Sequence, residues 1–86
     1  MNLGNKIREL RRQRNLTQEQ LAASLNISAQ AVSKWEMGAS YPDVAMLPTL
    51  ATFFKVSLDE LFDFDVRNID KDIEEIRIEF NKYFKI

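Results

Sequence analysis

Apolar residues recur along this chain at spacings of three and four rather than two. Such spacings gather side chains on one face of a helix, whereas a half-buried strand alternates apolar and polar residues. Only two glycines and two prolines interrupt the 86 residues, and no internal repeat is present. The sequence therefore predicts an all-α protein, and its length suits one hydrophobic core rather than two.

The chain contains neither cysteine nor histidine. Disulfide bonds, the common zinc sites and the side chain best suited to proton transfer near neutral pH are therefore excluded. Gly4 and Gly38 stand alone, so the sequence has no glycine-rich phosphate loop. The acidic residues near the C-terminus fall on an expected amphipathic helix, where their partner is water. We expect no enzyme activity, no metal and no cofactor.

No apolar run reaches the about 18 residues that a membrane span needs. The first residues also lack the apolar stretch of a secretory signal peptide. We therefore expect a cytoplasmic protein that has no membrane partner.

The first two helices are predicted from an apolar stripe and a capping motif. The first stripe consists of Leu3, Ile7 and Leu10. Its helix should end near Asn15. Thr17 and Gln20 have the spacing of a capping box, in which the hydroxyl and the amide side chain each bond the other residue's backbone N–H. A second helix is therefore expected to begin at Gln18.

A third helix is expected after a very short connection. Ser28 is suited to be its N-cap, and Gly38 stands where a left-handed residue would end it after Met37. Asn26 lies at the turn before it, and asparagine is one of the few non-glycine residues that visit the left-handed region routinely. Residues 18–37 thus predict two helices that cross over a tight turn. Their apolar positions are Leu21, Ala22, Leu25, Ile27, Val32 and Trp35.

Three more helices are expected in the second half. Pro48 is tolerated only in a first turn, so the fourth helix should begin after Val44. Ser57 and Glu60 have the spacing of a second capping box, which predicts a short fifth helix that ends near Phe62. The fourth stripe consists of Leu47, Leu50, Ala51 and Phe54, and the sixth of Ile69, Ile73, Ile76, Phe80 and Tyr83. We therefore divide the chain into a domain (1–62), a connector (63–68) and a C-terminal amphipathic helix (69–86).

Charge is distributed unevenly although the formal net charge is only −1. Residues 1–42 carry six basic and three acidic side chains, and residues 43–86 carry six basic and ten acidic ones. Because nucleic-acid binding needs a local basic surface rather than a basic average, the first part is the one suited to face phosphates.

Several linked motifs occur in the first 62 residues. They are LTQEQLA at 16–22, Ser28, VSKWEMG at 32–38, Tyr41-Pro42 and VSLDEL at 56–61. Together they resemble the Cro/CI-type, or lambda-repressor-like, family of helix-turn-helix transcriptional regulators, also called the xenobiotic-response-element family. The resemblance covers roughly Leu3 to Phe62. It implies a five-helix domain that binds double-stranded DNA sequence-specifically, and we expect a repressor that reads a palindromic operator through the major groove.

The helix from Ser28 to Met37 is expected to read the DNA bases. Stepping 100° per residue places Trp35 and Glu36 on the buried side with Val32. The outward side chains are Gln30, Ser33, Lys34 and Met37, with Ala29 beside them near the end of the helix that enters the groove. The alternative is that this surface is only a solvated helix face.

The outward residues have suitable chemistry for base recognition. Gln30 can bond adenine, Lys34 can donate to guanine, and Ala29 can pack on a thymine methyl group. We assign Ala29, Gln30, Ser33 and Lys34 to base contacts. We assign Gln18, Ser28 and Met37 to the phosphate backbone, with Gln18 matching the family's phosphate-binding position.

The resemblance also implies a salt bridge between Arg11 of the first helix and Glu36 at the end of the third. We favour this structural role for Arg11 over a DNA contact. Trp35 is expected to be a core residue rather than a base-stacking one. The pattern does not assign roles to the other arginines of the first helix.

A homodimer is expected because one helix-turn-helix unit reads only a few base pairs. The last apolar stripe has the a/d spacing of a coiled coil, so its helix is a candidate dimer contact. The alternative is that this stripe folds back on its own domain. A protein-interaction module, or an antitoxin-like regulator that binds a protein partner through the C-terminal helix, is the alternative function.

Overall fold

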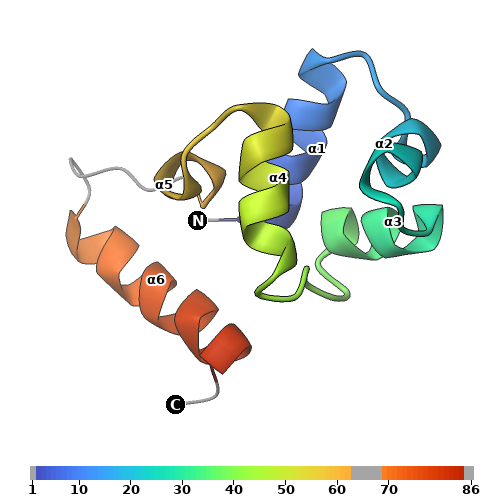
Figure 1. The fold of residues 1–86 in the computed structure, drawn as a ribbon. Coiled ribbons are helices and arrows are strands. Elements are labelled where there is room, and N and C mark those ends of the chain that lie inside the picture. Colours follow the sequence, from blue (N-terminus) through green and yellow to red (C-terminus); the bar gives the residue numbers. More distant parts are fainter. Residues whose placement is uncertain (1, 63–68, 85–86) are drawn as a thin grey trace.

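The computed structural model describes residues 2–62 and 69–84. Within these ranges the chain forms six helices and no strand, so the all-α prediction is confirmed (Figure 1). The helices are α1 (Leu3–Gln13), α2 (Gln18–Leu25), α3 (Ala29–Met37), α4 (Met46–Phe54), α5 (Leu58–Leu61) and α6 (Ile69–Phe84). The predicted connector at 63–68 lies outside the described residues. None of the helices in the described ranges is long and apolar enough to cross a membrane.

Helix starts are fixed by side chains that accept otherwise unpaired backbone N–H groups. Thr17 Oγ1 accepts from the Gln20 backbone at 3.0 Å, and the Gln20 side chain accepts from the Thr17 backbone at 2.8 Å, so the predicted capping box is present. Ser28 Oγ caps α3 by accepting from the Ala31 backbone at 3.1 Å. Ser57 caps α5 in the same way. Local sequence therefore decides where these helices begin.

The turn between α2 and α3 uses a left-handed residue, as expected. Asn26 has φ 59° and ψ 45°, and its backbone N–H bonds the last carbonyls of α2. Gly38 ends α3 with φ 75°. These two residues fix the lengths of both helices in the unit, because a continuing helix would need negative φ at each.

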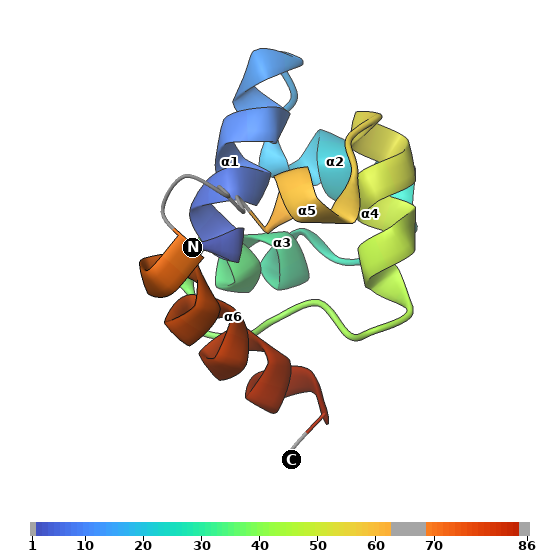
Figure 2. The same ribbon diagram turned by 90° about the vertical axis from the view of Figure 1, so that its left-hand side faces the viewer.

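The first five helices surround one core. α3 packs against both α1 and α2, and α5 lies between α1 and α4 (Figure 2). The core consists of Leu3, Ile7, Leu10, Leu21, Ala22, Leu25, Val32, Trp35, Leu47, Leu50, Ala51, Phe54 and Leu61. Each apolar stripe predicted for the first four helices contributes to it.

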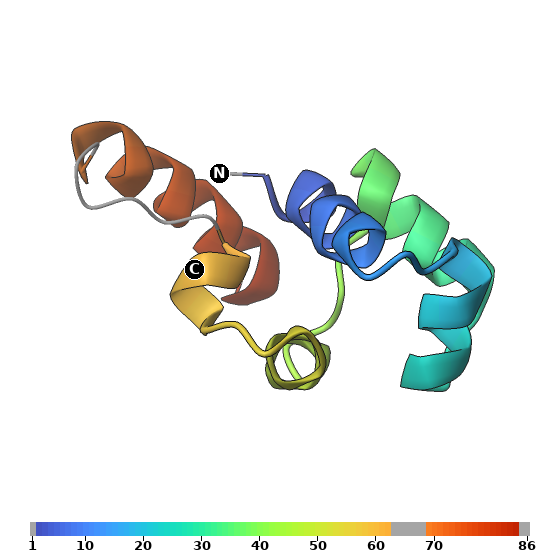
Figure 3. The ribbon, with the colours of Figure 1, turned by 90° about the horizontal axis from the view of Figure 1, so that it is seen from above.

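Helix α6 lies on the opposite side of the molecule from α2 (Figures 1 and 3). Its Tyr83 ring packs on the domain, edge to face with the rings of Tyr41 and Phe62. Ile76 and Phe80 of the predicted stripe line a cavity shared with α4 and α5. Ile76 and Phe80 thus lie beside the domain, although Phe80 stays 45% exposed. A contact of this helix with a second chain stays a prediction. The side chains of Ile69 and Ile73 lie outside the described residues.

Helices α1 and α3 touch backbone to backbone at Gly4. A Cβ atom built on Gly4 would collide with the carbonyl oxygen of Trp35 and would lie 3.2 Å from that of Glu36. Because both contacts are backbone atoms, no side-chain rotation can relieve them. Gly4 therefore sets the distance between the first helix and the third.

We predict that Gly4→Ala lowers the melting temperature by about 10 °C or more. Alanine gains about 1 kcal/mol of helix propensity, but pushing two packed helices apart costs about 3 kcal/mol, the upper end of the overpacking range, because the clashing atoms are backbone. The net loss of about 2 kcal/mol corresponds to about 8 to 16 °C. Thermal unfolding followed by circular dichroism measures the change. Gly38→Ala is the matched control: it meets no atom within 4 Å, so only its left-handed φ opposes the change. An equal or smaller loss for Gly4→Ala would contradict the close approach.

Candidate nucleic-acid interface

Helix α3 has one buried and one exposed face. Val32, Trp35 and Glu36 are buried, as the helical wheel predicts. Gln30 and Lys34 are exposed, and Met37 is 68% exposed. Two polar side chains with hydrogen-bonding ends thus stand one turn apart on the outer face.

Two of the remaining predicted contact residues are less exposed. Ser33 is half-buried, and Ala29 is half-buried with its side chain packed against the core. Ser28 is exposed, and its oxygen already accepts the Ala31 backbone bond. Its hydroxyl proton is still available for donation to an external acceptor.

The carboxylate of Glu36 joins three helices. Glu36 is only 3% exposed. Arg11 of α1 donates from Nε to Glu36 Oε2 at 2.7 Å and from Nη2 to Oε1 at 3.0 Å, so the structure brings the two residues of the expected salt bridge together in a bidentate pair. A two-point contact between planar groups also fixes their relative orientation.

Two further donors reach the same residue. Gln18, the first residue of α2, donates from Nε2 to Glu36 Oε1 at 3.0 Å. Arg8 donates from Nη2 to the Glu36 carbonyl at 3.0 Å, and its Nε lies 3.5 Å from Oε1. The sequence analysis assigned Gln18 only to phosphate and gave Arg8 no role. One signal could have indicated these further donors, because a buried carboxylate can accept more hydrogen bonds than one arginine donates to it.

These contacts decide the charge state of Glu36. Burial by itself raises the pKa of the carboxyl, but the hydrogen bonds from Arg11 and Gln18 oppose this, together with the charge of Arg11, and the net pKa is lowered. The same hydrogen bond raises the pKa of Arg11 against its burial. The pair is therefore ionised at neutral pH.

The arginines of this region differ in their contacts. Arg11 Nη1 also donates to the Leu16 carbonyl at 2.8 Å, which secures the turn between α1 and α2. Arg14 lies over the rings of Phe53 and Phe54, 5.5 and 5.6 Å from their centres. Arg12 is exposed. The basic character of α1 is thus partly used inside the protein.

This arrangement fixes which face of α3 is exposed. The buried face of α3 is held to α1 and α2 by a hydrogen-bonded charge cluster, and its outer face carries Gln30 and Lys34. A sequence model of the helix-turn-helix family matches residues 7–61. The chain belongs to the Cro/CI-type helix-turn-helix family. This family consists of DNA-binding transcription regulators, and its recognition unit corresponds to α2, Asn26 and α3.

The relatives of this chain in the helix-turn-helix family include both an activator and a repressor. The chain is 48% identical over 61 residues to the HTH-type transcriptional activator BcrR of Enterococcus faecalis, covering 71% of this chain and 30% of BcrR. It is 31% identical over 70 residues to the cryptic phage CTXphi transcriptional repressor RstR of Vibrio cholerae, covering 81% of this chain and 63% of RstR. The chain thus spans less than two thirds of either relative.

A solved helix-turn-helix structure has a similar fold. The crystal structure of Bacillus thuringiensis PlcR in complex with the peptide PapR7 and DNA matches 85% of this chain and 26% of PlcR. The TM-score is 0.64 and the sequence identity 27%.

We predict that Arg11→Ala acts mainly on stability. Removing one partner of a buried ion pair costs about 3 to 5 kcal/mol, and we expect the lower end because Gln18 and Arg8 still bond Glu36. Thermal unfolding measures the loss. The control is Arg12→Ala on the same helix, which should change stability by less than about 0.5 kcal/mol because the side chain is exposed. An unchanged melting temperature together with weaker DNA binding would instead make Arg11 a phosphate contact.

Proposed function

We propose that the protein is a transcriptional repressor that binds a palindromic operator as a homodimer, with the outer face of α3 in the major groove. The observation that supports this most directly is the division of α3 into a face fixed by the Glu36 cluster and a face that exposes Gln30 and Lys34. A helix held in this way can present its side chains to base edges without first becoming ordered.

Base recognition is assigned to four residues of α3. Gln30 bonds an adenine through its amide, and Lys34 donates to guanine O6 or N7. Ser33 bonds a neighbouring base edge. Ala29, packed on the core, offers a small apolar surface to a thymine methyl group.

Phosphate contacts are assigned to Gln18, Ser28 and Met37. Gln18 uses one amide hydrogen for Glu36, which leaves the second for a phosphate oxygen. Ser28 donates its hydroxyl proton. Met37 packs its exposed side chain on the sugar-phosphate backbone. These contacts position the protein on DNA but carry little sequence information.

We predict that Gln30→Ala and Lys34→Ala each weaken binding to the selected operator by about 1 to 3 kcal/mol, with a smaller effect on unrelated DNA. Selection from a random duplex pool identifies the operator, and titrations at fixed salt measure the affinities. The control is Gln13→Ala, an exposed glutamine at the end of α1. If both α3 variants keep full selectivity over competitor DNA, the assignment of the reading face is wrong.

Gln18→Ala separates a phosphate role from a structural one. Loss of a phosphate contact weakens binding to all sequences about equally. Loss of the bond to Glu36 lowers the melting temperature. Measuring both for the same variant assigns the residue to one role or to both.

We predict that binding depends on the spacing of two half-sites. A dimer places two recognition helices about 34 to 36 Å apart, in successive major grooves about 10 base pairs apart. Inserting five base pairs between the half-sites turns one of them to the far side of the duplex and should abolish cooperative binding, whereas inserting ten should restore part of it. Equal affinity for all three spacings would show that the protein binds as independent monomers.

Repression is proposed because occupying an operator that overlaps a promoter requires only the DNA-binding surface. In vitro transcription from such a promoter should fall as protein is added. An increase would make the protein an activator, which is the role that the name of BcrR states for that relative.

A further inference from the structure

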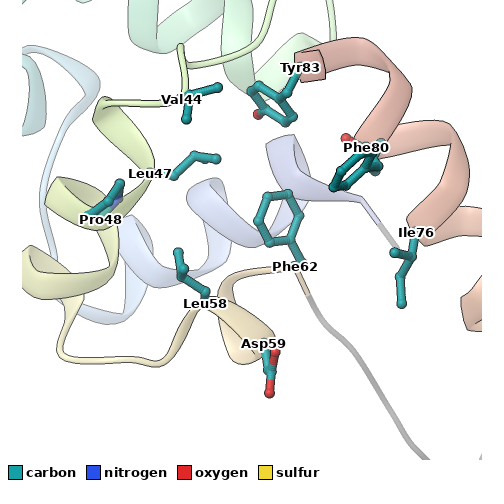
Figure 4. Close-up of a pocket in the computed structure, with 10 residues that line it drawn as sticks. Val44, Leu47, Pro48, Leu58, Asp59, Phe62, Ile76, Phe80 and Tyr83 are labelled. Carbon is teal, nitrogen blue, oxygen red and sulfur yellow. The ribbon is translucent and has the colours of Figure 1, made fainter. Parts of the chain in front are cut away.

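A cavity of about 390 Å³ lies between α6 and the domain, on α4 and α5 (Figure 4). Its walls are mainly apolar. In Figure 4 the side chains of Leu47, Phe62 and Tyr83 surround a common space. Binding sites for small molecules have volumes of about 300 to 1,000 Å³ and are mostly apolar with a few polar groups. The cavity therefore has the size and surface of a small-molecule site.

Two polar atoms at this cavity have no hydrogen-bond partner among the described residues. Glu79 lines the cavity and is only 8% exposed. Its Oε1 accepts from Lys82 Nζ at 3.2 Å, but its buried Oε2 accepts from no group. The buried hydroxyl of Tyr83 is also unpaired. A buried unpaired carboxylate oxygen is costly, so a donor supplied from outside would stabilise this arrangement.

The charged side chains that line the cavity carry the same sign. The charged residues of its lining in the described structure are both acidic, Asp59 and Glu79. Lys82 is outside the lining, where it bonds the Tyr41 hydroxyl and Glu79 Oε1. Counting Lys82 with Asp59 and Glu79 still leaves one negative charge beside the cavity. A cationic donor is thus favoured over an anionic or neutral one.

We propose that this cavity binds a small amphiphilic organic cation. The apolar body of the ligand packs between Leu47, Phe62 and Phe80. Its ammonium group donates to Glu79 Oε2 and to the Tyr83 hydroxyl oxygen. Such a ligand bridges α6 to α4 and α5, on the side of the molecule away from α2. The proposal goes beyond DNA binding and does not depend on the operator.

Three probes with the same carbon skeleton and different end groups test the chemistry on the full chain. They are 4-phenylbutylamine, 4-phenylbutanol and 4-phenylbutanoate, followed by amide chemical shifts in NMR titrations. The amine should bind at least about tenfold more tightly than the alcohol, a difference of about 1.4 kcal/mol, and the carboxylate should bind most weakly. Shifts should map to α4, α5 and α6.

Variants of the full chain locate the site. Glu79→Gln keeps the shape but removes the charge, and should reduce the preference for the amine over the alcohol about tenfold. Glu74→Gln is the matched control on the same helix, because Glu74 is exposed and pairs with Arg77. Leu58→Trp places a larger side chain at the cavity wall and should weaken all three probes.

The proposal is overturned if the amine fails to bind, if amine and alcohol bind equally to the unchanged chain, or if shifts map to α2 and α3. It is also overturned if Glu74→Gln and Glu79→Gln have the same effect. A second copy of the chain as the occupant predicts that Leu58→Trp lowers the sedimentation coefficient while the probes do not bind. Because the probe comparison uses the unchanged protein, a variant that fails to fold does not remove the test.

Discussion

The orientation of α3 within the domain depends on one buried carboxylate. Glu36 stands at the end of α3 and accepts hydrogen bonds from Arg11 on α1 and Gln18 on α2. A buried ion pair is weak evidence for stability, because desolvation cancels much of the attraction. Its contribution here is geometric: apolar packing tolerates small rotations of a helix, whereas a bidentate pair with a third donor allows one orientation.

The close approach at Gly4 completes this constraint. The missing side chain lets α1 lie against the Trp35 carbonyl, which brings Arg8 and Arg11 within reach of Glu36. The distance of α3 from α1 and its rotation are therefore both set by residues of α1, namely Gly4, Arg8 and Arg11. These contacts also determine the exposed face of α3. The side chains of α3 that do not point toward Glu36 and its partners or toward the core point toward solvent.

The two sides of the molecule are built differently. Around α3 the buried carboxylate of Glu36 has hydrogen-bond partners on both α1 and α2. At α6 the contact with the domain includes aromatic edges around Tyr83, and buried polar atoms of Glu79 and Tyr83 have no partner within residues 2–62 and 69–84. This difference agrees with the two proposals, in which a fixed face of α3 contacts DNA and a ligand completes the polar contacts beside α6.

The sequence by itself determined the helices, the left-handed turn at Asn26 and the outward side of α3, because spacing, capping and φ preferences act over a few residues. The salt bridge between Arg11 and Glu36 was predicted only from the family resemblance. The bonds of Arg8 and Gln18 to Glu36, residues 28 and 18 positions away, were missed, as was the need for glycine at position 4. The direction of the α6 stripe was left open, since its spacing fits a second chain as well as its own domain. A dimer contact through this stripe stays a prediction. Only the tertiary structure decided the contacts at Glu36 and Gly4, because they depend on how closely separate helices approach, and local patterns carry no information about that distance.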